Sequence, residues 1–288
     1  MARSRNKVVR LHRSEQGDFA IYIFVGVLAL VMVFPLFFTV MSSLKPLNEL
    51  FLFPPRILPV NPTLQNYRDM FVIMSGSIVP FSRYIFNTFF ITVVGTAGHI
   101  LFASMCAYPL ALYKFPGYRA YFHLVLLTLM FSTAVTAVPN FMIMTRLGWI
   151  DTYLAYIAPF FATPLGLFLL KPFVEQNVPQ SLVESAQMDG FNHWQIYRYM
   201  VMPLIKPAWL TLMVFSVQNL WGIGATIFIF DESLKTINFA MSQIVAAGIA
   251  RAGVGAAVGV IMMIVPITVF IITQSKVVET MAHSGIKE

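Results

Sequence analysis

Residues 184–203 read ESAQMDGFNHWQIYRYMVMP, a polar stretch with apolar sequence on both sides. It carries acids, amides, a histidine and an arginine in a chain of 288 residues that is 58% hydrophobic and only 11% charged. Soluble domains are about 45–50% apolar, and uncharged runs of about 18 residues or more are typical of transmembrane helices. The polar stretch is therefore predicted to be a structured loop between two membrane spans.

Six apolar stretches are long enough to cross about 30 Å of hydrocarbon as helices that rise about 1.5 Å per residue. Lipid cannot satisfy backbone hydrogen bonds, and the sequence lacks the alternating pattern of a β-barrel. The predicted fold is therefore an all-α integral membrane protein with six transmembrane helices over residues 19–275, between an N-tail (1–18) and a C-tail (276–288). The predicted spans are 19–42, 84–108, 120–143, 152–171, 207–230 and 252–275.

Basic residues predict how these spans are oriented. With an even number of spans both termini lie on one side, and the N-tail carries five Lys or Arg residues between Arg3 and Arg13. Positively charged segments stay in the cytoplasm, so both termini and residues 172–206 are expected there. The net charge of +7 is the bias expected of a chain surrounded by membrane lipid, so nucleic acid is not expected as a partner.

The first part of residues 172–206 is predicted to form a short amphipathic helix. Ser181 with Glu184 three residues later is typical of a capping box, and Gly190 can adopt the positive φ that ends a helix. A surface helix resting on anionic lipid would carry Lys or Arg on its polar face, whereas this one carries acids, which favours a protein partner with basic groups. The apolar face comprises Leu182, Val183, Ala186 and Phe191.

A second short helix is predicted directly after the glycine. Asn192 with Gln195 three residues later marks its start, and Pro203 is expected to stop it before the next span. The order of helix, glycine elbow, helix and proline indicates a defined docking element.

These spacings resemble the EAA loop in the permease subunits of binding-protein-dependent ABC importers. The family pattern is E-A-A, three residues, G, nine residues and then I-x-L-P, and every spacing is kept here. Ser185 stands where the family has Ala, Met200 where it has Ile, and Met202 where it has Leu. The matching positions are Glu184, Ser185, Ala186, Gly190, Met200, Met202 and Pro203.

Two further segments resemble carbohydrate importers of the maltose-permease type. Residues 42–71, SSLKPLNELFLFPPRILPVNPTLQNYRDMF, resemble the first outer loop, and residues 279–288, ETMAHSGIKE, resemble the C-terminal segment of the same subunit. Both are most similar to permeases for larger sugars, including uronate-rich oligosaccharides such as fragments of alginate or pectin. Within residues 217–222, VQNLWG, Gln218 replaces the tryptophan that the family usually has.

The resemblance implies a fold, a role and a set of partners. The fold is that of a type I ABC importer permease with a cytoplasmic coupling helix. The chain would form half of a carbohydrate pathway in the bacterial plasma (inner) membrane, with a second, different permease, two ATPase subunits and an extracytoplasmic solute-binding protein. It is not expected to be an enzyme. The sequence has no GxxxxGK[ST] loop, so ATP and Mg²⁺ are expected on the ATPase subunits and no cofactor on this chain.

The resemblance also assigns the residues that contact the ATPase subunits. The EAA helix docks in a groove on an ATPase subunit, and closure of the ATPase pair on ATP switches the membrane bundle between inward-facing and outward-facing states. The implied docking residues are Leu182, Val183, Glu184, Ser185, Ala186, Asp189, Gly190, Phe191 and Pro203. The C-tail residues implied to contact the ATPase pair are Ser284, Gly285 and Lys287.

Polar residues inside the spans are the candidates for the substrate pathway. Amides and aromatic faces hold sugars, so Gln218, Asn219 and Trp221 are predicted to line it, although amides also tie membrane helices together. The single cysteine, Cys106, lies in an apolar run, and no His, Cys or Asp cluster has the spacing of a metal site.

Two alternatives stay open from the sequence. A stand-alone secondary transporter needs no ATPase, but such carriers usually hold an ionisable relay, and no carboxylate lies near the middle of a predicted span. An ABC permease for a non-sugar solute, such as a polyamine or an amino acid, is disfavoured by the first outer loop and the C-tail.

Overall fold

The computed structural model describes residues 15–76, 79–246 and 248–284, which form helices and connecting segments without a β-strand, as the all-α prediction requires. The long helices are α1 (Glu15–Ser43), α4 (Phe81–Leu112), α12 (Lys206–Trp221) and α14 (Ala252–Ser284). Those of intermediate length are α3 (Gln65–Ser75), α5 (Tyr118–Thr128), α6 (Thr133–Leu147), α7 (Leu154–Phe161), α8 (Pro164–Asn177), α9 (Gln180–Met188) and α13 (Ile237–Ala246). The short ones are α2 (Leu47–Leu50), α10 (His193–Ile196), the π-helix η1 (Tyr197–Val201), α11 (Met202–Leu204) and the 3-10 helices η2 (Glu232–Leu234) and η3 (Ile249–Arg251).

Several helices in the described part of the chain are long and apolar enough to cross a membrane. Four qualify as they stand, and a bent pair adds a fifth if its two halves are one span. The pair joins His193–Leu204 to Lys206–Trp221 at an angle of 79°. The four are Gly17–Ser43, Phe81–Leu112, Leu154–Asn177 and Ile249–Gln274.

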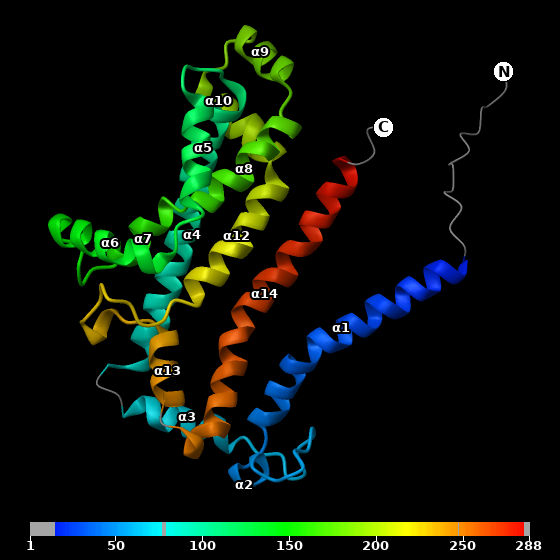
Figure 1. Ribbon diagram of the computed structural model, residues 1–288, viewed down its shortest axis with the longest axis vertical. Helices are drawn as coiled ribbons and strands as arrows, with labels where there is room; N and C mark the ends of the chain where they lie inside the picture. Colours follow the sequence, from blue (N-terminus) through cyan, green and yellow to red (C-terminus); the bar gives the residue numbers. More distant parts are fainter. Residues whose placement is uncertain (1–14, 77–78, 247, 285–288) are drawn as a thin grey trace.

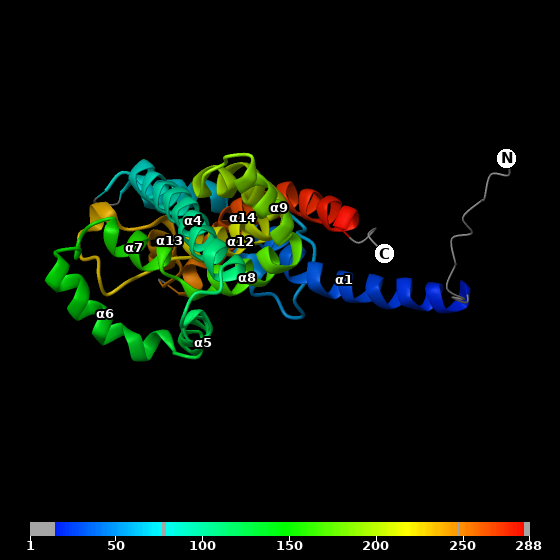
Figure 2. The ribbon, with the colours of Figure 1, turned by 90° about the horizontal axis from the view of Figure 1, so that it is seen from above.

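The predicted span 120–143 is not one helix. α5 ends at Thr128, and α6 begins after Ser132, whose Oγ accepts a hydrogen bond from the N–H of Ala134 at 3.2 Å. A serine N-cap starts a new helix because it satisfies a backbone donor that the helix start leaves free. The apolar run is therefore divided: α5 packs against α8, whereas α6 lies at the edge of the molecule (Figure 2).

The predicted span 207–230 is helical only as far as Trp221. A glycine caps α12 there, and the chain then turns toward Asp151. The N–H of Asp151 donates to the carbonyl of Phe228 at 3.0 Å, and its Oδ1 accepts from the N–H of Phe230 at 2.6 Å. These bonds satisfy backbone groups outside a helix, so the apolar sequence after Trp221 has no need of helical hydrogen bonds.

The first and last long helices, α1 and α14, are each longer than the spans predicted for them. α14 continues past the predicted span 252–275 to Ser284, so most of the predicted C-tail (276–288) is helix. α1 already includes the last residues of the predicted N-tail (1–18), whose first 14 residues lie outside the described part.

α4 lies at the centre of the bundle and packs most extensively against α8, α12 and α7. α12 also packs against α14, and α14 packs against α1 (Figure 1). α1 leaves the bundle at an angle, and no residue of its most apolar 18-residue stretch is buried in the isolated chain. A large exposed apolar surface of this kind faces lipid or another membrane subunit.

The contact between α4 and α8 depends on the absence of a side chain at Gly166. A Cβ added there would lie 2.5 Å from Nε2 of His99 and 2.6 Å from the Cβ of Ala103. Small residues allow membrane helices to approach closely, and dispersion contacts then hold them together. Gly166 therefore sets the distance between two helices at the centre of the fold.

The segment between α1 and α3 forms a compact loop at the end of the molecule opposite α9 (Figure 1). The two carboxylate oxygens of Glu49 accept hydrogen bonds from the N–H groups of Val60 and Asn61, at 2.9 Å each. The bond from Val60 is the main cause that holds the pKa of Glu49 below its ordinary value of 4.5. Asn66 donates to the carbonyl of Ser43 at 2.8 Å and so fastens α3 to the end of α1.

Candidate functional site

The coupling segment, residues 180–204, comprises α9, α10, η1 and α11 and lies at one end of the bundle (Figure 1). α9 begins at Gln180 after Pro179, and no side chain caps it. The predicted capping box of Ser181 and Glu184 is therefore wrong, because the helix starts earlier and places Ser181 inside its first turn. The Glu184 carboxylate instead accepts a hydrogen bond from Nε2 of Gln180 at 3.1 Å.

The glycine elbow after α9 is confirmed. Gly190 has a φ of +85°, in the left-handed region that favours glycine. The N–H of Phe191 donates to the carbonyl of Ala186, and that of Gly190 to the carbonyl of Gln187, both at 3.0 Å. These two bonds form a Schellman motif, which satisfies the last carbonyls of the helix and fixes the direction of the chain after it.

The predicted start of the second helix is also confirmed. Oδ1 of Asn192 accepts from the N–H of Gln195 at 2.8 Å, and Oε1 of Gln195 accepts from the N–H of Asn192 at 2.9 Å. This reciprocal pair satisfies two backbone donors at the helix start. The chain is thus held on both sides of the glycine elbow.

Pro203 does not stop the second helix. The chain passes through η1 and α11, where Pro203 is exposed, and breaks at Ile205, with φ −91° and ψ 16°. The missing N–H of a proline is tolerated here because the π-turn before it already interrupts the usual hydrogen-bond pattern. The indole N–H of Trp209 donates to the carbonyl of Met202 at 3.1 Å across the break and holds the bend.

The apolar face of α9 points mostly into the chain's own core. Val183 and Ala186 are each 4% exposed and share a core with residues of α4, α8, η1 and α12. An amphipathic helix buries its apolar stripe against the nearest apolar surface, which here belongs to the same chain. The predicted placement of these two side chains in an ATPase groove is therefore wrong for this structure, and they hold α9 in place instead.

Other side chains form the outward surface of the coupling segment, called the docking face below. Met188 is 88% exposed, Trp194 51% and Phe191 40%. Met188 and Trp194 were not in the predicted docking set, and the signal for Met188 is a large apolar residue on the polar side of an amphipathic helix. The docking face comprises Leu182, Glu184, Ser185, Met188, Asp189, Gly190, Phe191 and Trp194.

A groove of about 470 Å³ borders the start of the coupling segment. Its lining combines polar side chains, such as Asn177 and Ser181, with the apolar Leu182 and Leu204. The groove joins the docking face to the end of α8, so a partner that covers Leu182 would also reach the membrane bundle.

The three residues predicted for the substrate pathway do not form one site. Gln218 and Asn219 are exposed, and Nδ2 of Asn219 donates to the carbonyl of Phe215 in its own helix at 2.9 Å. Trp221 is 8% exposed, and its indole N–H donates to the carbonyl of Met262 at 2.9 Å. Trp221 therefore joins α12 to α14, and the pathway role of Gln218 and Asn219 stays a prediction.

The predicted C-tail contacts lie at the edge of the described residues. Ser284 is the last residue of α14, whereas Gly285 and Lys287 fall outside the described part of the chain. Among residues 15–76, 79–246 and 248–284, no group of three or more His, Cys, Asp or Glu residues is placed to hold a metal ion.

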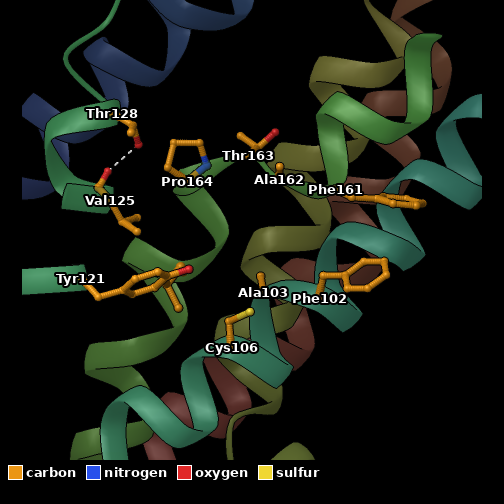
Figure 3. Close-up of a pocket in the computed structure, with 11 residues that line it drawn as sticks. Phe102, Ala103, Cys106, Tyr121, Val125, Thr128, Phe161, Ala162, Thr163 and Pro164 are labelled. Atoms are coloured by element: carbon orange, nitrogen blue, oxygen red, sulfur yellow. Dashed lines mark hydrogen bonds between the residues drawn. The ribbon is translucent and has the colours of Figure 1, made fainter. Parts of the chain in front are cut away.

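A pocket of about 450 Å³ lies between α4, α5 and the junction of α7 with α8 (Figure 3). Cys106 and Phe102 line it from α4, and Tyr121 lines it from α5 (Figure 3). The hydroxyl of Thr128 already donates to the carbonyl of Val125 in its own helix at 2.6 Å. The pocket therefore has few polar groups to hold a sugar and is not placed in the candidate site.

Two relatives from Bacillus subtilis (strain 168) align with most of this chain. The polygalacturonan/rhamnogalacturonan transport system permease protein YtcP is 32% identical over 230 residues, which cover 79% of this chain and 78% of that protein. The arabinooligosaccharides transport system permease protein AraQ is 30% identical over 206 residues, or 70% of this chain and 71% of that protein.

The fold is shared with a solved transporter. The crystal structure of a bacterial ABC transporter involved in the import of the acidic polysaccharide alginate contains a chain that matches with a TM-score of 0.77 and 22% identity, over 93% of this chain and 99% of that one. The arrangement is therefore the permease fold of type I ABC importers. The model of the family described as binding-protein-dependent transport system inner membrane component matches residues 18–282, so this chain belongs to that family.

Proposed function

We propose that this chain is the permease subunit of an ATP-driven importer that moves an oligosaccharide across the bacterial inner membrane. It forms half of the pathway beside a second, different permease, and two ATPase subunits that bind ATP and Mg²⁺ drive it. An extracytoplasmic binding protein delivers the sugar. Family membership and two relatives named for oligosaccharide or polysaccharide transport support this function.

The construction of the coupling segment carries the proposal. Val183 and Ala186 fix α9 to the core, while Met188 on its other side and Phe191 after the glycine elbow are exposed. A helix that is buried on one side and exposed on the other transmits the movement of a bound partner to the bundle. Glu184 and Asp189 add negative charge to the docking face, which fits a groove with an apolar floor and basic groups at its rim.

The orientation proposed for the chain places both termini in the cytoplasm. The end of α14 lies toward the end of the molecule that holds the coupling segment, and α1 begins nearer to that end than it finishes (Figure 1). The basic residues of the N-tail favour the cytoplasmic side, where the ATPase subunits bind ATP. One side of the membrane thus holds both termini and the docking face.

The proposed substrate is an oligosaccharide, and the finer proposal is an acidic one that contains uronate units. Support for the acidic sugar comes from the relative named for polygalacturonan and rhamnogalacturonan transport, at 32% identity. The relative named for arabinooligosaccharides, at 30% identity, makes a neutral oligosaccharide the natural comparison in an uptake assay.

The test is to purify the tagged chain from its native membrane and to measure uptake after reconstitution in lipid vesicles. We expect a second permease and ATPase subunits to co-purify, and sugar uptake to require ATP together with the binding protein. Uptake by this chain alone on a proton gradient would instead show a secondary transporter. Competition between oligogalacturonates and neutral arabino-oligosaccharides tests the acidic substrate.

A further inference from the structure

Buried polar side chains follow one side of α4 over most of its length. Apart from the adjacent pair Asn87 and Thr88, they recur every three to five residues, which keeps them near one helix face, and each is at most 7% exposed. α4 runs from the end of the molecule that holds α13 to the end that holds α9 and α10 (Figure 1). The residues are Tyr84, Asn87, Thr88, Thr92, Thr96, His99, Ser104 and Tyr108.

At its outer end α4 is bonded to the loop of residues 231–237. Asn87, which is fully buried, donates from Nδ2 to the carbonyls of Ser233 at 2.8 Å and Lys235 at 2.9 Å, and its Oδ1 accepts from the hydroxyl of Tyr153 at 2.6 Å. A single side chain thus joins α4, the outer loop and the segment before α7. Because these partners include two backbone carbonyls, the outer loop cannot shift without α4 unless buried hydrogen bonds break.

At its inner end α4 is bonded to the coupling segment. The fully buried hydroxyl of Ser104 lies 2.7 Å from that of Tyr197 in the π-helix η1. The Ser104 proton is donated to the carbonyl of Leu101 at 3.0 Å, so Tyr197 is the donor of the bond between the helices. A second connection runs from Tyr113, whose hydroxyl lies 3.1 Å from Nδ1 of His193 at the start of α10.

The buried polar side chains in the middle of α4 hold it against its neighbours without forming a continuous chain of hydrogen bonds. His99 contacts the hydroxyl of Ser216 on α12 at 3.0 Å and the carbonyl of Thr163 before α8 at 3.2 Å. Among the described residues, the buried hydroxyls of Thr92 and Thr96 have no hydrogen-bond partner. The two ends are therefore joined by the helix itself, which suits transmission of movement and not of protons.

We propose that α4 transmits movement of the outer loop 231–237 to the coupling segment, and that the Ser104–Tyr197 hydrogen bond is its inner joint. Both residues are then positioning residues for transport, since neither lies on the docking face. The π-turn that carries Tyr197 is a kind of helix defect that is frequent at functional sites. This inference rests on the proposed function, because it needs an ATPase at one end and a delivered sugar at the other.

The first test separates coupling from stability in the purified complex, reconstituted in lipid vesicles with its binding protein. Ser104→Ala leaves the Tyr197 hydroxyl buried without an acceptor, so it lowers both stability and coupling. Tyr197→Phe removes only the donor, because Ser104 keeps its bond to Leu101, so the thermal midpoint is expected to stay near that of the wild type. Each variant should lower sugar uptake per ATP hydrolysed by about fivefold, and the double variant by no more than either one.

Two matched controls belong to this test. Ser242→Ala removes a hydroxyl that donates to the carbonyl of Phe239 in its own helix, and Tyr121→Phe removes the phenol of a half-exposed residue on α5. Both are expected to keep the wild-type ratio of uptake to ATP hydrolysis. A Tyr197→Phe complex with the wild-type ratio would overturn the inference and leave Ser104 with a structural role only.

The second test asks whether the two ends of α4 act together. Asn87 and Ser104 are 17 positions apart, or about 26 Å along a helix, and substitutions at such distances are normally additive. We expect Asn87→Ala with Ser104→Ala to be non-additive in the ATP hydrolysis that the sugar-loaded binding protein stimulates, while Ser242→Ala with Ser104→Ala stays additive. Additivity in both pairs would refute transmission through α4.

Measurements on the wild-type complex distinguish failure of the proposed function from failure of the role proposed for α4. If it neither takes up sugar with ATP nor responds to the binding protein, the proposed function fails. If it does both and Tyr197→Phe changes neither, the function stands and the role of α4 fails.

Discussion

Replacement of Gly190 tests whether the glycine elbow sets the position of the docking face. Gly190 has a φ of +85°, and a Cβ added there would meet no atom within 4 Å. The cost of a side chain is therefore conformational and not steric. The left-handed conformation costs an ordinary L-residue about 1–2 kcal/mol, and more for a β-branched one, whereas asparagine adopts it readily. Gly190→Val is thus expected to reduce the population of the native elbow relative to bent alternatives by about 5-fold to 30-fold.

The assay compares Gly190→Val with Gly190→Asn, since both side chains fill the same open space. ATP hydrolysis stimulated by the binding protein and sugar uptake should fall by about 5-fold or more for valine and by less than about 3-fold for asparagine. Membrane insertion of both variants, measured by yield and by gel filtration in detergent, should match the wild type. The reasoning is refuted if the two variants lose activity to the same extent, because the effect would then follow the added volume and not the backbone.

Four further substitutions test the packing and the electrostatics. Met188→Ala should weaken co-purification of the ATPase without changing the thermal midpoint, whereas Val183→Ala should lower the free energy of unfolding by about 2 kcal/mol; equal behaviour of the two would contradict the division of α9 into an inner and an outer side. Gly166→Ala should cost about 1–3 kcal/mol, since its Cβ would lie 2.5 Å from His99; an unchanged melting temperature would show that α4 and α8 separate easily. Because the pKa of Glu49 is lowered from 4.5 in the folded loop, its stabilisation is complete above the unfolded value and is lost as pH falls through the lower folded value. The protection factors for hydrogen exchange in residues 51–61, which correct for the intrinsic pH dependence of exchange, should therefore fall below pH 4.5, and Glu49→Gln should abolish that fall.

In the coupling segment, the sequence predicts the backbone conformation correctly where one or two residues determine it. Gly190 and the Asn192–Gln195 pair were predicted correctly because a positive φ and a capping box depend on those residues alone. Ser181 and Pro203 misled because each lies next to a competing feature. Pro179 starts the first helix earlier, and the π-turn allows the second to pass through the proline.

Long-range packing explains the remaining differences. Apolar sequence in a membrane chain is expected both at lipid and in the core, so composition did not show that Val183 and Ala186 face inward. The early end of α12 follows from bonds that the distant Asp151 makes with the turn before η2. The break before α6 has a local cause instead, because one serine cap starts a new helix inside a uniformly apolar run.

Two different constraints act on the nine residues of α9, and which one acts on a residue depends on the side of the helix that the residue occupies. Val183 and Ala186 must fit the interior of this chain, while Met188 and its exposed neighbours are outside that core and, on the proposed function, must fit the ATPase. Substitutions at the exposed positions can therefore change which ATPase the chain binds without changing the packing of the membrane bundle. A permease built this way can change its energy-supplying partner over evolution while keeping the same sugar, and the reverse change is equally open to it.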